Sequence, residues 1–327
     1  MSIQGFTEIF TGDGPATAQG AQGGLFYRFA FGNWLIGTYY ITFMAKILEK
    51  EQLSDDVYKF VVDAPLIAEE RRAGQFIILQ TDLESGERIP LTIADANREK
   101  GTITLIFQAI GKSTIDLSQF KTGDSIPVLT GPLGSPTHIE NFGHAVCVCG
   151  GIGTAPMYPI AQALKNAGNR VTVIIGARRK DLIIMEKEME EIADSVIMCT
   201  DDGSYGRKCL VTEPLKEICE GEKPNFAIAI GPPVMMKFCA ETTKPYSVKT
   251  FASLNSIMVD GTGMCGCCRV TVGGSVKFVC VDGPEFDAHL VDWENMLKRM
   301  GTYKQRETLA KERALEKLKE CKCKASC

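Results

Sequence analysis

Histidine is scarce in this 327-residue chain, which contains three, and basic residues are not in surplus. The 36 Lys and Arg are outnumbered by 40 Asp and Glu, which gives a formal net charge of −4. This balance argues against a nucleic-acid-binding protein, because such proteins usually carry a basic surplus. His138, His144 and His289 are isolated, and no Ser/His/Asp or Cys/His spacing suggests nucleophilic catalysis. We therefore expect no catalytic side chain.

The N-terminal segment also lacks the charged, apolar and small-residue regions of a secretory signal. Residues 24–43 form an apolar, aromatic run that is barely long enough for a membrane helix, and Arg28, Asn33 and two glycines interrupt it. We expect residues 1–43 to be a leader or a mis-assigned start outside the fold, with Met44 as the true start. A membrane anchor is the alternative. The expected location is the cytoplasm.

Cysteine, by contrast, is abundant, with thirteen residues. In a reducing compartment, clustered cysteines indicate metal ligands or redox groups before disulfides. Six cysteines are scattered in apolar or helical surroundings, and three lie in the C-terminal tail. The tail contains a CxC motif that would suit a metal, but a thiol-bearing helix end is the simpler interpretation. The remaining four, and the main candidates for chemistry, are Cys265, Cys267, Cys268 and Cys280.

Short apolar runs divide the rest of the chain into parts. Residues 44–140 hold closely spaced β-rich runs separated by turns, which predicts a small antiparallel β-barrel. Residues 141–245 alternate strands and helices, which predicts a parallel α/β sheet. Residues 246–292 return to short strands around the cysteines, and residues 293–327 read as a charged helix and a Cys-containing tail. The predicted fold class is α/β plus all-β.

The cysteine cluster has a spacing close to that of a plant-type iron–sulfur site. Asp260, Cys265, Cys268 and Cys280 follow the pattern D-x4-C-x2-C-x11-C, whereas the usual pattern is C-x4-C-x2-C…C. A carboxylate can ligate iron as a harder donor than thiolate. Three alternatives remain: a structural zinc site, unligated thiols, or Cys267 in place of Asp260 as the fourth iron ligand.

Two turns that begin with glycine follow apolar strands. Gly150, Gly151 and Gly153 precede Thr154 and Pro156, an arrangement that lets a pyrophosphate approach a helix N-terminus, although a lone turn of this kind is weak evidence. A second turn, 231–236, is equally consistent with an ordinary helix start. Residues 178–180 are basic and suit either a 2′-phosphate or a solvated surface.

The run from Ser253 to Trp293 resembles the electron-transfer subunit of dihydroorotate dehydrogenase. It resembles more closely the small (alpha) subunit of NADH-dependent reduced ferredoxin:NADP⁺ oxidoreductase, also described as the sulfide dehydrogenase beta subunit. In the dihydroorotate type the first ligand is Cys, and Asp260 at that position is typical of the ferredoxin type. The resemblance covers about residues 44–300.

The resemblance implies an FAD-binding barrel at 44–140, a nucleotide-binding domain at 141–245 and a [2Fe–2S] domain at 246–292. Family members carry an Arg-x-(Tyr or Leu)-Ser run on the flavin strand, in which the Arg is three residues before the hydroxyl residue. Here Ile89 occupies the position expected for the Arg, and Arg88 is one residue early. Leu91 would lie against the flavin ring and Thr92 near its N5 atom. The implied flavin-binding residues are Arg88, Pro90, Leu91, Thr92, Ile106, Gln108, Gly111, Lys112, Ser113 and Thr114.

The implied partner of the flavin is NAD(H) or NADP(H), between which the sequence does not decide. The residues expected to hold this nucleotide are Gly150, Gly151, Gly153, Thr154, Pro156, Arg178, Gly231, Pro232 and Met235. The implied cluster ligands are Asp260, Cys265, Cys268 and Cys280.

The implied function is the flavin and iron–sulfur subunit of a ferredoxin:NAD(P)⁺ oxidoreductase. It would exchange hydride between NAD(P)H and FAD and pass single electrons through the [2Fe–2S] cluster. The expected partner is a large flavoprotein that resembles the glutamate synthase small subunit, with ferredoxin reached through the complex. The alternatives are the electron-transfer subunit of dihydroorotate dehydrogenase and a zinc-stabilised interaction module. Neither a nucleic acid nor a membrane is an expected partner.

Overall fold

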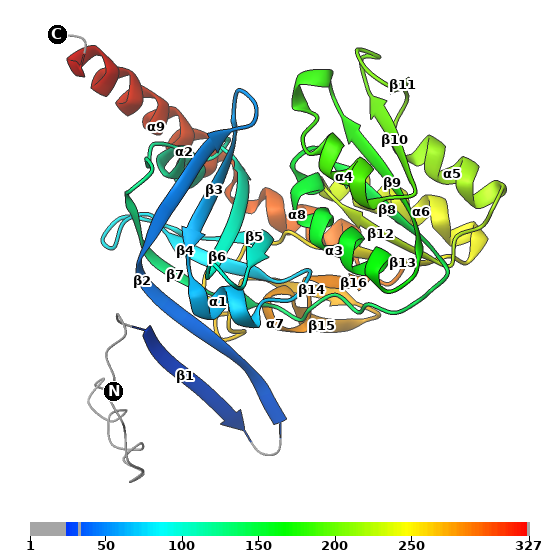
Figure 1. Cartoon of the computed structure of the whole chain (residues 1–327), viewed down its shortest axis with the longest axis horizontal. Helices are drawn as coiled ribbons and strands as arrows, with labels where there is room; N and C mark the ends of the chain where they lie inside the picture. The colour runs from blue at the N-terminus through cyan, green and yellow to red at the C-terminus, as the bar shows by residue number, and fades with distance from the viewer. Residues whose placement is uncertain (1–23, 32–33, 326–327) are drawn as a thin grey trace.

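The structure, a computed structural model, describes residues 24–31 and 34–325. In Figure 1 a β-barrel in blue and cyan lies beside an α/β part in green and yellow, and a golden segment with β14 and β15 lies below both. The strands are β1 Gly24–Phe31, β2 Trp34–Gln52, β3 Val57–Asp63, β4 Phe76–Gln80, β5 Arg88–Asn97, β6 Thr102–Gln108, β7 Ser125–Leu133, β8 His144–Gly150, β9 Arg170–Ala177, β10 Ser195–Thr200, β11 Arg207–Lys208, β12 Phe226–Ile230, β13 Lys249–Ser253, β14 Arg269–Val272, β15 Ser275–Phe278 and β16 Glu285–Asp287. The helices are α1 Pro65–Glu70, α2 Lys112–Ser118, α3 Thr154–Asn166, α4 Glu186–Ile192, α5 Thr212–Glu220, α6 Pro233–Thr243, α7 Val279–Asp282, α8 Trp293–Met300 and α9 Lys304–Ala325.

The barrel closes because β7 pairs with both β4 and β2. Its strand order is β2-β3-β6-β5-β4-β7, and β1 pairs with β2 outside the closed ring. Side chains alternate along each strand, so Ile77 and Leu79 fill the barrel core. Phe76 and Ile78 point to the other side and join a core shared with the rest of the chain. The predicted antiparallel barrel is confirmed.

The strand that enters the barrel begins before Met44. Strand β2 starts at Trp34, and Tyr40 already pairs with Gly131 of β7. Residues 24–31 and 34–43 are therefore strands, which contradicts the alternative of a membrane helix. The assignment of residues 1–43 to a leader stays a prediction, and residues 1–23 lie outside the described residues. Within the described ranges, no helix combines the length and apolar character that crossing a membrane requires.

The second sheet has the order β11-β10-β9-β8-β12-β13-β16. All its neighbours are parallel except β13 and β16, which pair antiparallel. Strands β8 and β12 are buried along their whole length, as expected for central strands covered on both faces. Because these strands are parallel, their carboxyl ends meet at one edge, where ligands of such sheets bind. The predicted parallel-sheet domain is confirmed.

The cysteine-containing segment is joined to both other parts. Its strands β13 and β16 extend the parallel sheet, and only β14 and β15 form a separate two-stranded sheet. Cys268 and Cys280 belong to one hydrophobic core with Phe76 and Ile78 of the barrel and Val148 of the sheet. The barrel, sheet and cluster segment thus pack as one unit, which places their functional loops close together.

Candidate flavin, nucleotide and cluster site

The first group of predicted flavin-binding residues, 88–92, lies on strand β5, and its side chains alternate between the two faces of the strand. Leu91 pairs with Ile77 and packs against the barrel core. Thr92 pairs with Phe76, and Pro90 with Ile78, so both belong to the outer face of the strand. Pro90 and Thr92 are half-buried on this outer face. Leu91, expected to touch the flavin ring, lies on the core side.

Arg88 begins this strand and carries an unsatisfied donor. Its Nε atom is buried and has no hydrogen-bond partner among the described residues. A buried N–H without a partner is costly, and a phosphate or carboxylate oxygen would satisfy it. Arg88 also lies close enough to Asp260 to help lower the pKa of that carboxyl. This environment is compatible with the predicted role of Arg88 as a flavin-binding residue.

A second group of predicted flavin-binding residues, 111–114 at the start of α2, contacts the group on β5. Ser113 Oγ donates a hydrogen bond of 2.8 Å to Glu87, the residue before Arg88. At the same turn, Thr114 Oγ1 accepts from the amide of Gly111 and donates to its carbonyl, both at 3.1 Å. A Cβ at Gly111 would meet only Thr114 Oγ1, at 3.9 Å, so the backbone of the turn is accessible.

The other predicted flavin-binding residues of 106–114 are engaged within the protein. Lys112 forms an ion pair of 3.3 Å with Asp116. Gln108 Nε2 donates to Asp56 over 2.9 Å, and Ile106 is buried. The structure thus groups the predicted flavin residues around β5, the end of β6 and the first turn of α2.

The glycine turn after β8 is shaped by close backbone contacts. A Cβ at Gly153 would stand 2.2 Å from the carbonyl oxygen of Ile230, so this position requires glycine. Gly151 has a positive φ of 55°, and no atom lies within 4 Å of where its Cβ would be. Thr154 Oγ1 donates to the Gly151 carbonyl over 2.9 Å and fixes the turn at the start of α3. The open side at Gly151 is where a pyrophosphate can approach.

The two predicted nucleotide motifs lie against each other. A Cβ at Gly231 would be 2.9 Å from Gly150 Cα, and one at Gly150 would be 2.5 Å from Met235 Sδ and 2.8 Å from Pro232. This contact follows from the pairing of β8 with β12, which aligns Cys149 with Ile230. The residues of both turns therefore lie side by side at the carboxyl edge of the sheet.

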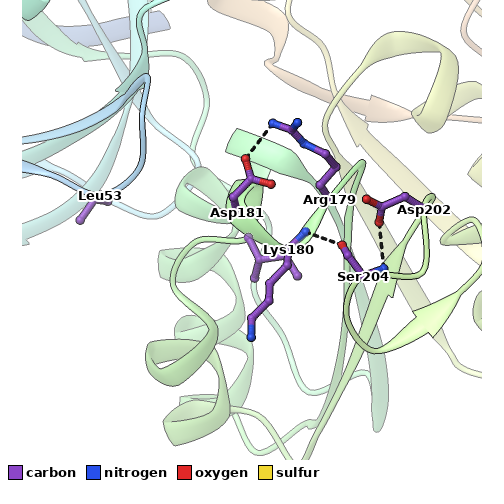
Figure 2. Close-up of a pocket in the computed structure, with 7 residues that line it drawn as sticks. Leu53, Arg179, Lys180, Asp181, Asp202 and Ser204 are labelled. Atoms are coloured by element: carbon purple, nitrogen blue, oxygen red, sulfur yellow. Dashed lines mark hydrogen bonds and ion pairs between the residues drawn. The ribbon is translucent and has the colours of Figure 1, made fainter.

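A cavity of about 660 Å³ lies further along the same edge (Figure 2). It is lined from the barrel side by Leu53 and from the sheet side by residues that follow β9 and β10. Arg179 forms an ion pair of 2.8 Å with Asp181, and Ser204 Oγ accepts from the Lys180 amide over 2.9 Å. The residues that line it are Leu53, Arg179, Lys180, Asp181, Ile183, Asp202 and Ser204.

Two differences from the sequence expectation appear at this cavity. The predicted nucleotide-binding residue Arg178 is exposed and is not among the lining residues, whereas its neighbours Arg179 and Lys180 are. Asp181 was not anticipated as a partner of Arg179, because an ion pair two residues apart gives no recognisable sequence pattern. The sequence also did not predict that Leu53 lines this cavity, because only the fold brings this turn residue of the barrel next to the sheet.

In the cysteine segment, the structure brings two predicted ligands together. Cys268 Sγ and Cys280 Sγ are 3.2 Å apart and buried, and the Cys280 amide donates to Cys268 Sγ over 3.4 Å. The contact between the two sulfurs lowers the pKa of Cys268 and raises that of Cys280. Two converging sulfurs with an amide donor are a donor set that suits iron.

The other two predicted ligands lie on the loop before Cys268. Asp260 Oδ2 accepts from the amides of Thr262 at 2.9 Å and Met264 at 3.3 Å. Burial alone would raise the pKa of Asp260, but these hydrogen bonds and Arg88 lower it overall, so the carboxylate is ionised. Cys265 is exposed. Across the described residues, no three His, Cys, Asp or Glu side chains are gathered closely enough to hold a metal.

Strand β5 connects these elements. A small cluster that includes Ala94 of β5 and Ile106 of β6 packs against Ala155 of the nucleotide turn. On the same barrel, a Cβ at Gly261 would be 2.6 Å from Ile78, whose strand neighbour is Pro90. The nucleotide turn and the cluster loop therefore flank the outer face that carries Thr92.

Known families match two segments of the chain. Residues 147–241 match the oxidoreductase NAD-binding domain, and residues 255–292 match the iron–sulfur cluster binding domain of dihydroorotate dehydrogenase B. Both segments fall within the predicted domains, whose boundaries stay predictions. The match at 255–292 contains all four candidate cluster ligands.

Individual relatives extend over most of the chain. A dihydroorotate dehydrogenase B (NAD(+)) electron transfer subunit homolog from Thermotoga maritima is 46% identical over 84% of this chain and 97% of its own. The electron transfer subunit from Desulforamulus reducens is 34% identical over 77% and 98%. A chain of the NADH-dependent reduced ferredoxin-NADP oxidoreductase structure is 46% identical, with a TM-score of 0.79 over 84% of this chain and 99% of that one.

A cytochrome P450 reductase from Amycolatopsis, 20% identical with a TM-score of 0.55, shares the fold over 64% of this chain and 67% of its own. Together the matches confirm the prediction of a flavin-, iron–sulfur- and nicotinamide-dependent oxidoreductase subunit that works with a larger catalytic partner. The chain belongs to the family of dihydroorotate dehydrogenase B electron transfer subunits and their homologues.

Proposed function

We propose that this chain is the flavin and iron–sulfur subunit of a ferredoxin:NAD(P)⁺ oxidoreductase. The observation that carries the proposal is the arrangement across β5 and its neighbour β4, where the nucleotide turn packs beside Ala94 of β5 and the cluster loop packs beside Ile78 of β4. This order suits transfer from a nucleotide on one side to a cluster on the other. The 46% identity to the ferredoxin-NADP oxidoreductase chain supports it.

When bound, FAD accepts hydride and yields single electrons, and the [2Fe–2S] cluster carries them one at a time. The chain's own residues supply binding and orientation. Gly151 leaves room for the pyrophosphate at the start of α3, and Gly231 keeps the adjoining turn close to Gly150. Thr92 presents its hydroxyl on the outer face of β5. Hydride transfer needs no side-chain acid or base, which agrees with the isolated histidines.

For the nucleotide we propose NAD(H). The cavity at the end of β9 and β10 holds Asp181 and Asp202, and Asp181 already neutralises Arg179 at 2.8 Å. A 2′-phosphate would meet these carboxylates, whereas a ribose diol can donate hydrogen bonds to them. Hydrogen bonding from Ser204 lowers the pKa of Asp202, so it is ionised at neutral pH.

For the cluster we propose Asp260, Cys265, Cys268 and Cys280 as ligands. The lowered pKa of Cys268 and the ionised Asp260 supply anionic donors before any metal arrives. Cys267 instead lies beside a separate cavity of about 230 Å³ formed with α8, and its carbonyl accepts from Arg299 over 3.2 Å. Its role is therefore structural.

We propose a larger flavoprotein that resembles the glutamate synthase small subunit as the partner, with ferredoxin reached through it. The second candidate is the electron transfer subunit of dihydroorotate dehydrogenase, which the domain match at 255–292 favours. The electron transfer subunit homolog from Thermotoga maritima has the same 46% identity as the ferredoxin-NADP oxidoreductase chain, whereas the electron transfer subunits not termed homologs are 30–34% identical, so identity alone does not separate the two candidates.

The two candidates are separated by the partner and by the substrate. The tagged chain is purified from its native cell, and the stoichiometric partner is identified by mass spectrometry. The complex is then assayed with NADH, NADP⁺ and ferredoxin, and separately with dihydroorotate and NAD⁺. The proposal expects a large flavoprotein and activity in the first assay. A dihydroorotate-oxidising partner with activity in the second would replace it with the alternative.

A further inference from the structure

Two cysteines that the proposed function does not use lie at the edge of the nucleotide sheet. Cys199 is in β10, and Cys209 directly follows β11. The Cys209 thiol donates a hydrogen bond to Cys199 Sγ over 3.4 Å. A disulfide bond is about 2.05 Å long, so the sulfurs need to approach by roughly 1.3 Å. Cys199 is buried, and Cys209 is partly exposed.

The chain between these thiols forms a wall of the 660 Å³ cavity. Thr200 Oγ1 donates to the Tyr205 carbonyl over 2.6 Å, which closes the loop at its base. Asp202 accepts from the Ser204 amide over 2.9 Å, and both line the cavity (Figure 2). A covalent bond between residues 199 and 209 would tie the two ends of this loop together.

We propose that Cys199 and Cys209 form a reversible disulfide, and that this bond changes the affinity of the adjacent cavity for nicotinamide nucleotide. The effect on nucleotide affinity rests on the proposed nucleotide-binding function of the cavity. Thiol pairs of this kind in reducing compartments are typically transient and redox-sensing.

The reaction is thiol–disulfide exchange with a low-molecular-weight disulfide as oxidant. The Cys209 thiolate attacks one sulfur of that disulfide, forms a mixed disulfide and releases one small thiol. Cys199 then loses its proton and attacks the Cys209 sulfur, which releases the second small thiol and closes the protein disulfide. Two protein thiols are oxidised and one external disulfide is reduced to two thiols.

The order of attack follows from accessibility. Burial, together with the contact between its sulfur and that of Cys209, raises the pKa of Cys199 to about 12, so Cys199 is the resolving thiol. Cys209 is the partly exposed member that an external disulfide can reach. Cys147 and Cys239 are fully buried, and burial raises the pKa of each to about 12, so they are poor competitors.

The experiment uses the flavin- and cluster-loaded protein. It is incubated with oxidised glutathione, alkylated and digested with trypsin, which cuts after Arg207 and Lys208 and so separates the two cysteines. We expect a disulfide-linked peptide pair that dithiothreitol releases. The pair is absent in Cys199→Ser and Cys209→Ser and present in Cys219→Ser, a control on α5. The NADH dissociation constant of the wild type is expected to change at least threefold on oxidation, and that of Cys209→Ser to stay constant.

Each outcome has one meaning. Absence of the linked pair from the folded wild-type protein overturns the disulfide. A linked pair with an unchanged NADH dissociation constant overturns its effect on the cavity. A linked pair in a protein that binds NADH in neither state contradicts the proposed function of the cavity while the thiol pair stands.

Discussion

Gly261 rests on Ile78, so the loop that follows Asp260 lies directly on barrel strand β4. A Cβ at Gly261 would be 2.6 Å from Ile78 Cδ1 and 2.8 Å from Leu133 Cδ1, and its φ is +85°. Both neighbours are buried, at 1% and 5% exposure, and have little room to move. The glycine therefore sets the distance between the cluster loop and the flavin barrel.

Replacing Gly261 by Ala is expected to lower the free energy of unfolding by about 2 kcal/mol, because it adds steric overlap to a left-handed backbone. Gly274 is the matched control, since its φ is +78° and no atom lies within 4 Å of its Cβ position. Gly274→Ala should cost about 1 kcal/mol from backbone strain alone. Denaturant unfolding measures both, and equal losses would contradict the contact between loop and barrel.

Asp260→Ala is expected to reduce iron content at least twofold, because the cluster loses an anionic donor. Asp260→Cys should retain the cluster with an altered paramagnetic resonance spectrum, since thiolate replaces carboxylate. Cys267→Ser is the control and should leave both iron content and spectrum unchanged. An identical spectrum for Asp260→Cys and the wild type would remove Asp260 from the ligand set.

The barrel, the parallel sheet and their order were predictable from local patterns. The runs YKFVVD, FIILQ and TITLIFQ are short, β-rich and bounded by turns, and each became a barrel strand. In the charged run 181–193 helix α4 begins only at Glu186, because Met185 has a left-handed φ of 58°. Ile184 is buried in the small cluster with Ala155, a long-range contact that periodicity cannot reveal.

The part of the candidate site that was predictable is the part whose residues follow a recognisable ligand spacing. Cys268 and Cys280 meet at 3.2 Å, as their places in one ligand pattern suggested. The face on which Leu91 lies was not predictable, because a strand's register decides it and a shift of one residue reverses every side chain. Nor did the sequence reveal that β13 and β16, on either side of the cysteines, belong to the nucleotide sheet, since strand pairing is non-local.

Glu285 should make stability depend on pH. Burial raises the pKa of this carboxyl from its ordinary 4.5 to about 7, and it accepts a 2.6 Å hydrogen bond from Thr137. The folded protein holds the proton more tightly than the unfolded chain, so stability falls as pH rises from about 4.5 to about 7 and then levels. Glu285→Gln, which can still accept from Thr137, should be about 1–2 kcal/mol more stable than the wild type at pH 8.

Urea unfolding at pH 5.5 and pH 8 tests whether the stability of the protein falls as pH rises. The exposed Glu99→Gln variant serves as the control and should follow the wild-type dependence on pH. A Glu285→Gln variant that loses stability to the same extent as the wild type between these two pH values would show that Glu285 does not bind the proton.

Asp181→Asn should shift nucleotide preference toward NADPH. The change releases Arg179 from its 2.8 Å ion pair and removes a negative charge from the cavity. We expect the ratio of kcat/KM for NADPH over NADH to rise roughly threefold to tenfold, which is modest because the pair is exposed. The assay uses an artificial electron acceptor, with Glu188→Gln on α4 as a control of equal charge change. An equal change in this ratio of kcat/KM in both variants would show that the nucleotide does not bind in the cavity beside Asp181.

The central claim is that nucleotide, flavin and cluster act in series within this chain. Anaerobic addition of NADH to the purified, cofactor-loaded protein tests it, with flavin absorbance and the paramagnetic signal of the cluster followed together. The account predicts that NADH bleaches the flavin bands and that the signal of a reduced [2Fe–2S] cluster then appears. A protein that lacks flavin bands and iron, or whose flavin is bleached while the cluster stays oxidised, would contradict it.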